Sequence, residues 1–308
     1  MKKTIKILIS ITIMCLALVI TMSSCQKTGK RVYFDFPASG GMIEIPIGAE
    51  SDKDLDSIIG PSKTVFTEES APQKIVIDTI FPGLHSDSPL YYKNSSNSYR
   101  SGIWRYYEYS TETGSAMCCF YPKHNKLRSF LEGTFEEALK KKYLNLSENE
   151  LLSKEQCLKK AEEFLAVLYN NAESFKCYDD GESRHKLEGL DLDCMYYKYL
   201  FSWEVDGVEI CDVRIEVRND GVIDFVLNEN CMEAYYYDKT TDLDFSAALK
   251  EADDAVNEKM KSFGEKYTAQ FQKASLLLGT KNRLLLRAQY ELYEDDSLGS
   301  AIYVYVVL

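Results

Sequence analysis

Histidine is scarce in this chain, and the residue patterns of several common enzyme sites are missing. Only three histidines occur, His85, His124 and His185, and no C-x-x-C motif is present. This excludes the usual spacing of zinc sites. The sequence also has no G-x-S-x-G turn for a hydrolase nucleophile and no glycine loop that would cradle a phosphate. We therefore expect neither a metal nor a cofactor.

Basic residues are outnumbered by acidic ones. The chain has 36 Lys and Arg against 48 Asp and Glu, a formal net charge of −12. A chain of this charge repels nucleic acid and anionic lipid headgroups through its own field. This predicts that nucleic acid is not a partner. Attachment to a membrane would then have to come from a lipid rather than from surface charge.

The first 25 residues are the most informative segment. Three lysines give a positive start, residues 7–20 are apolar, and Met22-Ser23-Ser24 leads into Cys25. This pattern predicts an export signal. The alternatives are a plain signal peptide and an uncleaved membrane anchor, although the apolar run is shorter than the roughly 20 residues that a spanning helix needs.

This segment resembles the lipobox of bacterial lipoproteins, in which the equivalent cysteine is lipidated on its sulfur and becomes the mature N-terminus. Met22 departs from the pattern, because that family most often has leucine there. The resemblance implies that residues 1–24 are a signal peptide and that Cys25 is lipidated. Residues 25–30 would then tether a globular part to the extracytoplasmic face of the cell membrane.

Residues 31–150 are predicted to be rich in strands. Apolar residues alternate on both sides of Gly40-Gly41, which predicts a β-hairpin over residues 32–47. A similar alternation predicts a second hairpin over residues 104–121. The stretch 86–98 is rich in serine and asparagine and is expected to be a loop.

Residues 151–240 and 241–308 share an order of elements, which is one helix followed by three antiparallel strands. Ser153 and Gln156 match a helix-capping box, and a shift of 91 residues places Ser153 on Asp244, a second cap. The fold class is therefore α+β, with a β-rich N-terminal region and two α-β-β-β units. Each helix carries one apolar stripe, made of Cys157, Ala161, Phe164, Leu165 and Leu168 in the first and of Ala248, Ala252, Ala255, Val256 and Phe263 in the second.

The two units resemble PepSY-like domains and the related tandem repeats of bacterial surface lipoproteins. The resemblance covers residues 152–308 and rests on the order of elements and on the strand, acidic turn and strand over residues 213–223. Asn219-Asp220-Gly221 lacks the threonine that usually precedes that glycine, and the second unit has no equivalent glycine turn. The resemblance implies a noncatalytic module that restrains peptidases or binds envelope components, and it carries over no functional residue.

Seven cysteines follow Cys25, an odd number that cannot all pair within one chain. Cys118 and Cys119 point to opposite faces of a predicted strand, so we expect one in the core and one at an edge or surface. Cys211 and Cys231 both fall on a core face. They are diagonal neighbours at roughly 7 to 8 Å, too far apart for a disulfide unless a bulge intervenes.

Two segments are candidates for binding. Tyr235, Tyr236 and Tyr237 lie in the connector between the units, where they are hard to bury, and an exposed aromatic cluster there would suit a partner. The final strand carries Ile302, Val304 and Val306 and is followed by no hairpin. One side of it is therefore expected to be an unpaired edge that accepts an added strand.

The leading prediction is a noncatalytic envelope lipoprotein that binds a protein or peptide partner and restrains a peptidase. The alternative is an envelope hydrolase that uses Ser183 and His185, which lie in a predicted polar loop over residues 179–187. The hydrolase hypothesis requires a nucleophile on a strained turn together with an oxyanion hole. The sequence offers neither motif.

Overall fold

The computed structural model describes residues 31–37, 49–60, 65–67, 71–86, 88–98, 102–240, 242–295 and 297–308. The predicted α+β class is confirmed, with N-terminal strands followed by helix-plus-strand units. The strands are β1 (Val32–Asp35), β2 (Val65–Thr67), β3 (Lys74–Ile75), β4 (Leu90–Ser98), β5 (Gly102–Ser110), β6 (Gly114–Tyr121), β7 (Lys126–Thr134), β8 (Lys176–Lys186), β9 (Asp193–Val205), β10 (Val208–Arg218), β11 (Ile223–Leu227), β12 (Tyr267–Leu278), β13 (Leu284–Glu294) and β14 (Ser297–Val307). The helices are α2 (Leu55–Ile59), α3 (Ile77–Ile80), α4 (Glu136–Tyr143), α5 (Lys154–Leu168), α6 (Cys231–Tyr237) and α7 (Phe245–Phe263), with 3₁₀ turns η1 (Glu148–Glu150), η2 (Ala172–Ser174) and η3 (Thr280–Asn282).

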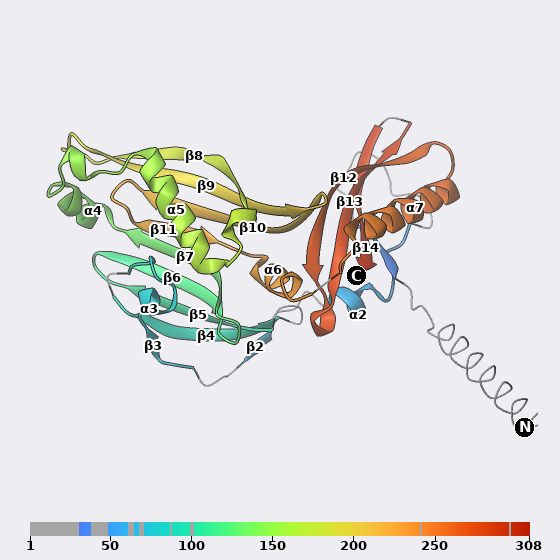
Figure 1. The fold of residues 1–308 in the computed structure, drawn as a ribbon, viewed down its shortest axis with the longest axis horizontal. Helices are drawn as coiled ribbons and strands as arrows, with labels where there is room; N and C mark the ends of the chain where they lie inside the picture. The colour runs from blue at the N-terminus through green and yellow to red at the C-terminus, as the bar shows by residue number, and fades with distance from the viewer. Residues whose placement is uncertain are drawn as a thin grey trace, which may run out of the picture.

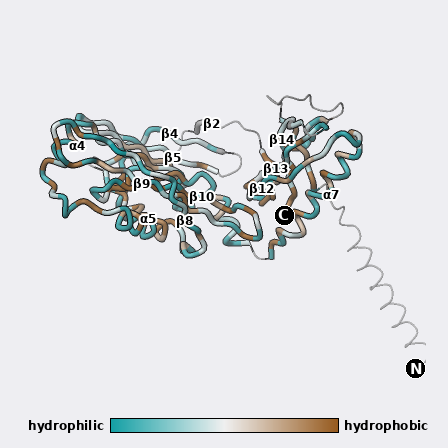
Figure 2. Tube along the Cα trace, turned by 90° about the horizontal axis from the view of Figure 1, so that it is seen from above, coloured by the Kyte–Doolittle hydropathy of each residue, from teal (hydrophilic) through white to brown (hydrophobic). Residues whose placement is uncertain are grey.

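Hydrogen bonds join the described strands into one mixed sheet. Its main path runs β1-β14-β13-β12-β10-β11-β7-β6-β5-β4-β2, and β9 and β8 branch from β10. Figure 1 shows this sheet as two bodies, a larger one with β2 to β11 and a smaller one with β12 to β14. Figure 2 shows hydrophobic stretches running among the strands, with hydrophilic ones at α4 and along α7.

In the larger body the N-terminal strands and the first unit share one sheet. β11 pairs antiparallel with β7, with Phe225 opposite Leu131. One apolar cluster contains Phe81, which follows α3, Phe120 of β6 and Phe164 of α5. The N-terminal strands and the first unit therefore bury a common core. α3 and α5 lie on the same face of this sheet (Figure 1).

The first unit has the predicted helix. Ser153 Oγ accepts a hydrogen bond from Gln156 N at 3.3 Å, and Gln156 Oε1 accepts one from Ser153 N at 2.8 Å, which closes the capping box. All five residues of the expected apolar stripe are buried. Helical periodicity and one cap were therefore sufficient to place α5.

Two expected loops are strands. β4 occupies most of the serine-rich stretch 86–98, where Ser95 and Ser96 are buried and the hydroxyl groups of Tyr92 and Ser95 lie 2.8 Å apart. β8 occupies most of residues 179–187 and is paired along its length with β9, with every side chain exposed. Neither strand was predicted, because both stretches are polar and show no alternating apolar face.

The predicted loop Asn219-Asp220-Gly221 is a tight turn that is buried against α4. Gly221 has φ +84°, a conformation that favours glycine, and its N–H donates to Arg218 O at 2.8 Å. Tyr143 donates to Asn219 Oδ1 at 2.5 Å. The turn therefore fixes α4 to the strands β10 and β11.

The smaller body is the second unit with two additions. Asp244 Oδ1 accepts from Ala247 N at 2.9 Å and caps α7, as predicted. Phe245, Ala248, Ala252, Val256 and Met260 form the buried face of α7, so Ala255 and Phe263 of the expected stripe lie at its margin. β1 and α2, from the N-terminal region, pack on this body.

The expectation of an unpaired edge on the last strand is wrong. β1 pairs antiparallel with β14, with Val32 opposite Val306 and Phe34 opposite Val304. Ile302, Val304 and Val306 are all 0% exposed, so these side chains belong to the core and do not face a partner. The proposed first-hairpin partner of β1, residues 43–47, lies outside the described residues.

A narrow joint connects the two bodies. β10 and β12 run parallel and pair at two positions, Val208 with Ala274 and Glu209 with Ser275. α6 lies beside this joint (Figure 1), and Leu278 N donates to Glu233 Oε1 of α6 at 3.3 Å. α6 therefore helps to hold the smaller body against the larger one.

The seven cysteines that the structure describes are all free thiols. Cys118 and Cys119 are both buried, so the expectation that one of them would reach an edge or surface is wrong. A β-bulge lies between Cys119 and Phe120, and the side chain of Arg128 hydrogen-bonds to the Cys119 sulfur. Cys211 and Cys231 form no disulfide. In the part of the chain that the structure describes, no helix is long and apolar enough to cross a membrane, and no cluster of residues could hold a metal ion.

Candidate binding cleft

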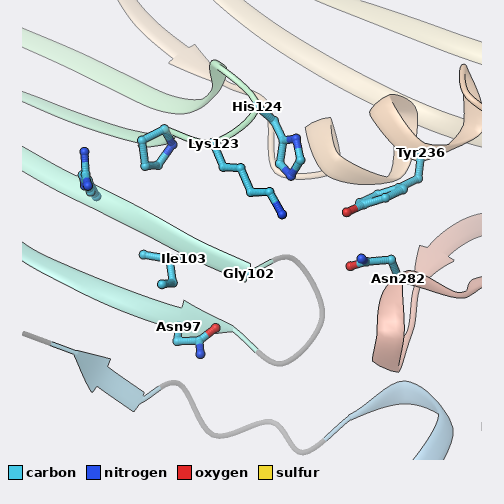
Figure 3. Close-up of a pocket in the computed structure, with 9 residues that line it drawn as sticks. Asn97, Gly102, Ile103, Lys123, His124, Tyr236 and Asn282 are labelled. Carbon is cyan, nitrogen blue, oxygen red and sulfur yellow. The ribbon is translucent and has the colours of Figure 1, made fainter. Parts of the chain in front are cut away.

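A cleft of about 750 Å³ opens beside the joint between the two bodies. It lies where the β4–β5 end, the β6–β7 turn, α6 and η3 meet, so each body contributes to its wall (Figure 3). We call it the junction cleft. It is lined by Asn97, Gly102, Ile103, Arg105, Pro122, Lys123, His124, Tyr236 and Asn282.

The β6–β7 turn contributes Lys123 and His124 to the cleft. Pro122 fixes the backbone after β6, His124 N donates to Tyr121 O at 3.2 Å, and Asn125 takes a left-handed conformation with φ +50°. This tight geometry exposes Lys123 and leaves His124 half-buried against α6. Figure 3 shows Lys123 extending into the space between β5 and α6.

α6 supplies the aromatic side of the cleft. The ring of His124 lies 4.5 Å from that of Tyr235 and 6.1 Å from that of Tyr236, measured between centroids. The Tyr236 hydroxyl points toward the same space as Asn282 (Figure 3). Burial raises the pKa of Tyr236 above 10, so its hydroxyl remains a hydrogen-bond donor at neutral pH.

The three connector tyrosines do not form the exposed cluster expected from the sequence. Each is half-buried, and they serve different purposes. Tyr237 stacks on Phe245 at 5.7 Å and meets Trp203 edge-on at 5.2 Å, which anchors α6 in the core. Only Tyr236 lines the junction cleft, and Tyr235 supports His124 behind it.

Positive charge gathers around the cleft despite the acidic composition of the chain. Lys239 Nζ lies 4.7 Å and Lys126 Nζ 5.9 Å from the centre of the Tyr235 ring, within the range of cation–π attraction. Lys126 also donates to Leu168 O at the end of α5, at 3.2 Å. Among the described residues that line the cleft, Arg105 and Lys123 are cationic and none is acidic.

His124 responds to this local field. Its pKa is lowered from 6.5, first because partial burial disfavours the charged ring, and then because Lys123, Lys239 and Lys126 repel a positive charge. The ring is therefore neutral at neutral pH, with one nitrogen as donor and one as acceptor. The cleft thus combines cations, a neutral imidazole, amides and a phenol.

The residues of the hydrolase alternative lie elsewhere. Ser183 and His185 sit two positions apart on β8, at the far edge of the larger body, and both are exposed. In the described part of the chain no hydrogen bond joins the two side chains, and β8 is a paired strand rather than a strained turn. The structure therefore gives no support to the nucleophile and base that this alternative needs.

The tyrosines of α6 were predicted from the sequence as a binding segment, but the residues of the other cleft walls were not. Lys123 and His124 lie in Pro-Lys-His-Asn-Lys, the segment 122–126. Three basic or ionisable side chains in five residues are a local signal in a chain of net charge −12. Arg105 and Asn282 had no such signal, because they reach the cleft only through the packing of distant elements.

No protein-family model matches the chain, and no curated protein matches it. Among solved structures, the chain is similar to the Bacillus megaterium YpeB C-terminal domain, with 10% sequence identity and a TM-score of 0.32. The likeness covers 73% of this chain and 93% of that one. Neither activity nor partner follows from a likeness of this degree.

Proposed function

We propose that this chain is a noncatalytic, lipid-anchored protein of the cell envelope that binds a protein or peptide partner in the junction cleft. The observation that carries the proposal is the cleft itself. It joins an aromatic wall on α6 to cations on the β6–β7 turn and β5, in a cavity of a size typical of binding sites. Tyrosine and arginine are both enriched at protein recognition surfaces.

The cellular location of the chain and the class of its partner are inferred from the sequence. Cys25, which lies outside the described residues, would carry the lipid and hold the two bodies at the extracytoplasmic face of the membrane. The resemblance to PepSY-like units favours a peptidase as the partner. The short β10–β12 joint lies beside the cleft, so a partner seated there would contact both bodies at once.

Site-specific photo-crosslinking tests this function. A photoreactive phenylalanine analogue replaces Tyr236 in the full chain, expressed in its native host, and a matched chain carries it at Tyr178, a 48% exposed residue of β8. We expect a discrete adduct with a second protein from position 236 and none from position 178. Adducts of equal yield from both positions, or none from position 236, would contradict binding at the cleft. Mass spectrometry of the adduct then shows whether the captured protein is a peptidase.

A further inference from the structure

We propose that the junction cleft recognises carboxylate side chains, and that its ligand is an acidic peptide segment. This inference rests on the function proposed above and names the chemistry of the partner. It is carried by the convergence of Lys123, Tyr236 and Asn282 on one space, where none of the described lining residues is an acid that would neutralise the cations.

The cleft can satisfy a carboxylate on more than one side. Figure 3 shows the side chain of Lys123 reaching the space that Tyr236 and Asn282 also face from the opposite wall. An ammonium group, a phenol and an amide are all donors to a carboxylate oxygen, and bonds to charged acceptors are stronger than neutral ones. Arg105, which also lines the cleft, adds a guanidinium as a partner for a neighbouring acid.

The remaining walls fit the apolar parts of a peptide. Ile103 and Pro122 also line the cleft. They offer apolar surface to the methylene groups of a glutamate side chain, while the carboxylate reaches the donors. Backbone amides of an extended peptide can pair with the side-chain amides of Asn97 and Asn282.

Charge outside the cleft favours a short acidic segment over a long polyanion. The chain carries a net charge of −12, and fields from exposed charges decay over about 8 Å at physiological ionic strength. A carboxylate in the cleft is therefore attracted chiefly by Lys123 and Arg105, the cations that line it. A polymer of phosphates that extended past the cleft would meet the acidic surface instead.

Binding of defined probes tests the inference. Titration calorimetry compares an eight-residue peptide of alternating glutamate and leucine with its glutamine and lysine counterparts, using the full chain in detergent. We expect the glutamate peptide to bind at least about tenfold more tightly than the glutamine peptide, with affinity falling as salt rises. Lys123→Gln should weaken the glutamate peptide about tenfold. Lys159→Gln is the matched control, because the Lys159 side chain on α5 is 77% exposed, and it should leave the affinity unchanged.

Equal affinity for the glutamate and glutamine peptides would overturn the inference, as would an unchanged affinity in Lys123→Gln. Inorganic polyphosphate is a further probe. If it binds more tightly than the glutamate peptide, the ligand is a polyphosphate and the inference of an acidic peptide is wrong. Circular dichroism confirms that each variant is folded before its affinity is measured.

His124 gives an independent readout. A carboxylate bound beside its ring favours the protonated form, so the glutamate peptide should raise the pKa of His124 and the glutamine peptide should not. NMR of labelled histidine measures this, and His124→Gln assigns the signal. If the pKa does not move but position 236 still crosslinks to a partner protein, the acidic ligand is wrong and the proposed function stands. If no adduct forms at position 236, the proposed function fails.

Discussion

The guanidinium of Arg218 donates two hydrogen bonds of 2.9 Å to the carboxylate of Asp220, and their side chains are only 2% and 1% exposed. Lys142 of α4 adds an ion pair to Asp220 at 2.6 Å, and Arg218 also donates to Thr134 Oγ1 at 3.3 Å. Burial alone would raise the pKa of Asp220, but Arg218 and Lys142 outweigh it and lower that pKa. This buried charge network joins β7, α4 and the β10–β11 turn.

Arg218→Met should lower the free energy of unfolding by about 3–5 kcal/mol, because it leaves a buried carboxylate without its main partner. Urea unfolding of the full chain measures the change. The control is Lys250→Met, which breaks an exposed ion pair with Asp254 on α7 and should cost less than about 0.5 kcal/mol. Similar losses in the two variants would show that the buried pair has no special weight.

Asp224→Asn should change how stability depends on pH. Burial, and then the nearby charge of Glu216, raise the pKa of Asp224 from 3.8 to about 8. The folded state therefore holds a proton that the unfolded state releases, so this contribution to stability is greatest below about pH 4 and is lost as the pH rises through 8.

The amide of the Asp224→Asn variant is neutral at every pH. The variant should exceed the natural chain in free energy of unfolding by at least about 1 kcal/mol at pH 8, and this advantage should shrink toward zero at pH 4. Urea titrations across that range measure it. Parallel stability curves for the two proteins would refute the raised pKa, and Asp254→Asn on the exposed face of α7 serves as the control.

Gly279→Ala should destabilise the smaller body by about 1–3 kcal/mol, through a clash. An added Cβ would lie 2.4 Å from Ile58 O and 2.9 Å from Leu285 Cδ1, although φ at Gly279 is an ordinary −91°. Gly133→Ala is the matched control, because its Cβ would meet nothing closer than 3.8 Å. Thermal melts that fall equally in both variants would argue against close packing of α2 on η3.

Cys25→Ser should release the chain from the membrane, since no lipid can then be attached to that position. Fractionation of native-host cells measures the shift from the detergent-extracted membrane fraction to the soluble one. Cys177→Ser removes the exposed thiol of β8 and should leave the chain in the membrane fraction. A Cys25→Ser chain that remains in the membranes would contradict lipidation as the anchor.

Elements with a periodic apolar face were predictable from the sequence. Ser153 with its helical stripe predicted α5, and Asp244 predicted the start of α7. The alternation around Gly221 predicted the β10–β11 hairpin. In each of these cases the signal lies within about 20 consecutive residues, because the same segment supplies both the cap or turn and the buried face.

Features that depend on distant partners were not predictable. β8 has no buried face and exists as a strand because β9 offers it a hydrogen-bonding edge. Tyr236 was predicted from the sequence as a binding residue, but Arg105 and Asn282 come to line the same cleft only through the packing of distant elements. A cleft assembled from four separate segments leaves no pattern within any one of them.

β1 is the first of the described strands to be synthesised, and it pairs with β14, which is the last. β1 therefore cannot pair until synthesis of the described chain is almost complete. Arg31 donates to Val307 O at 2.9 Å across a separation of 276 positions. Closing so long a loop is slow, so the smaller body completes its sheet only at the end of synthesis. A product that terminated before β14 would leave β1 and the outer side of β13 open together, and two bare strand edges on one molecule invite aggregation.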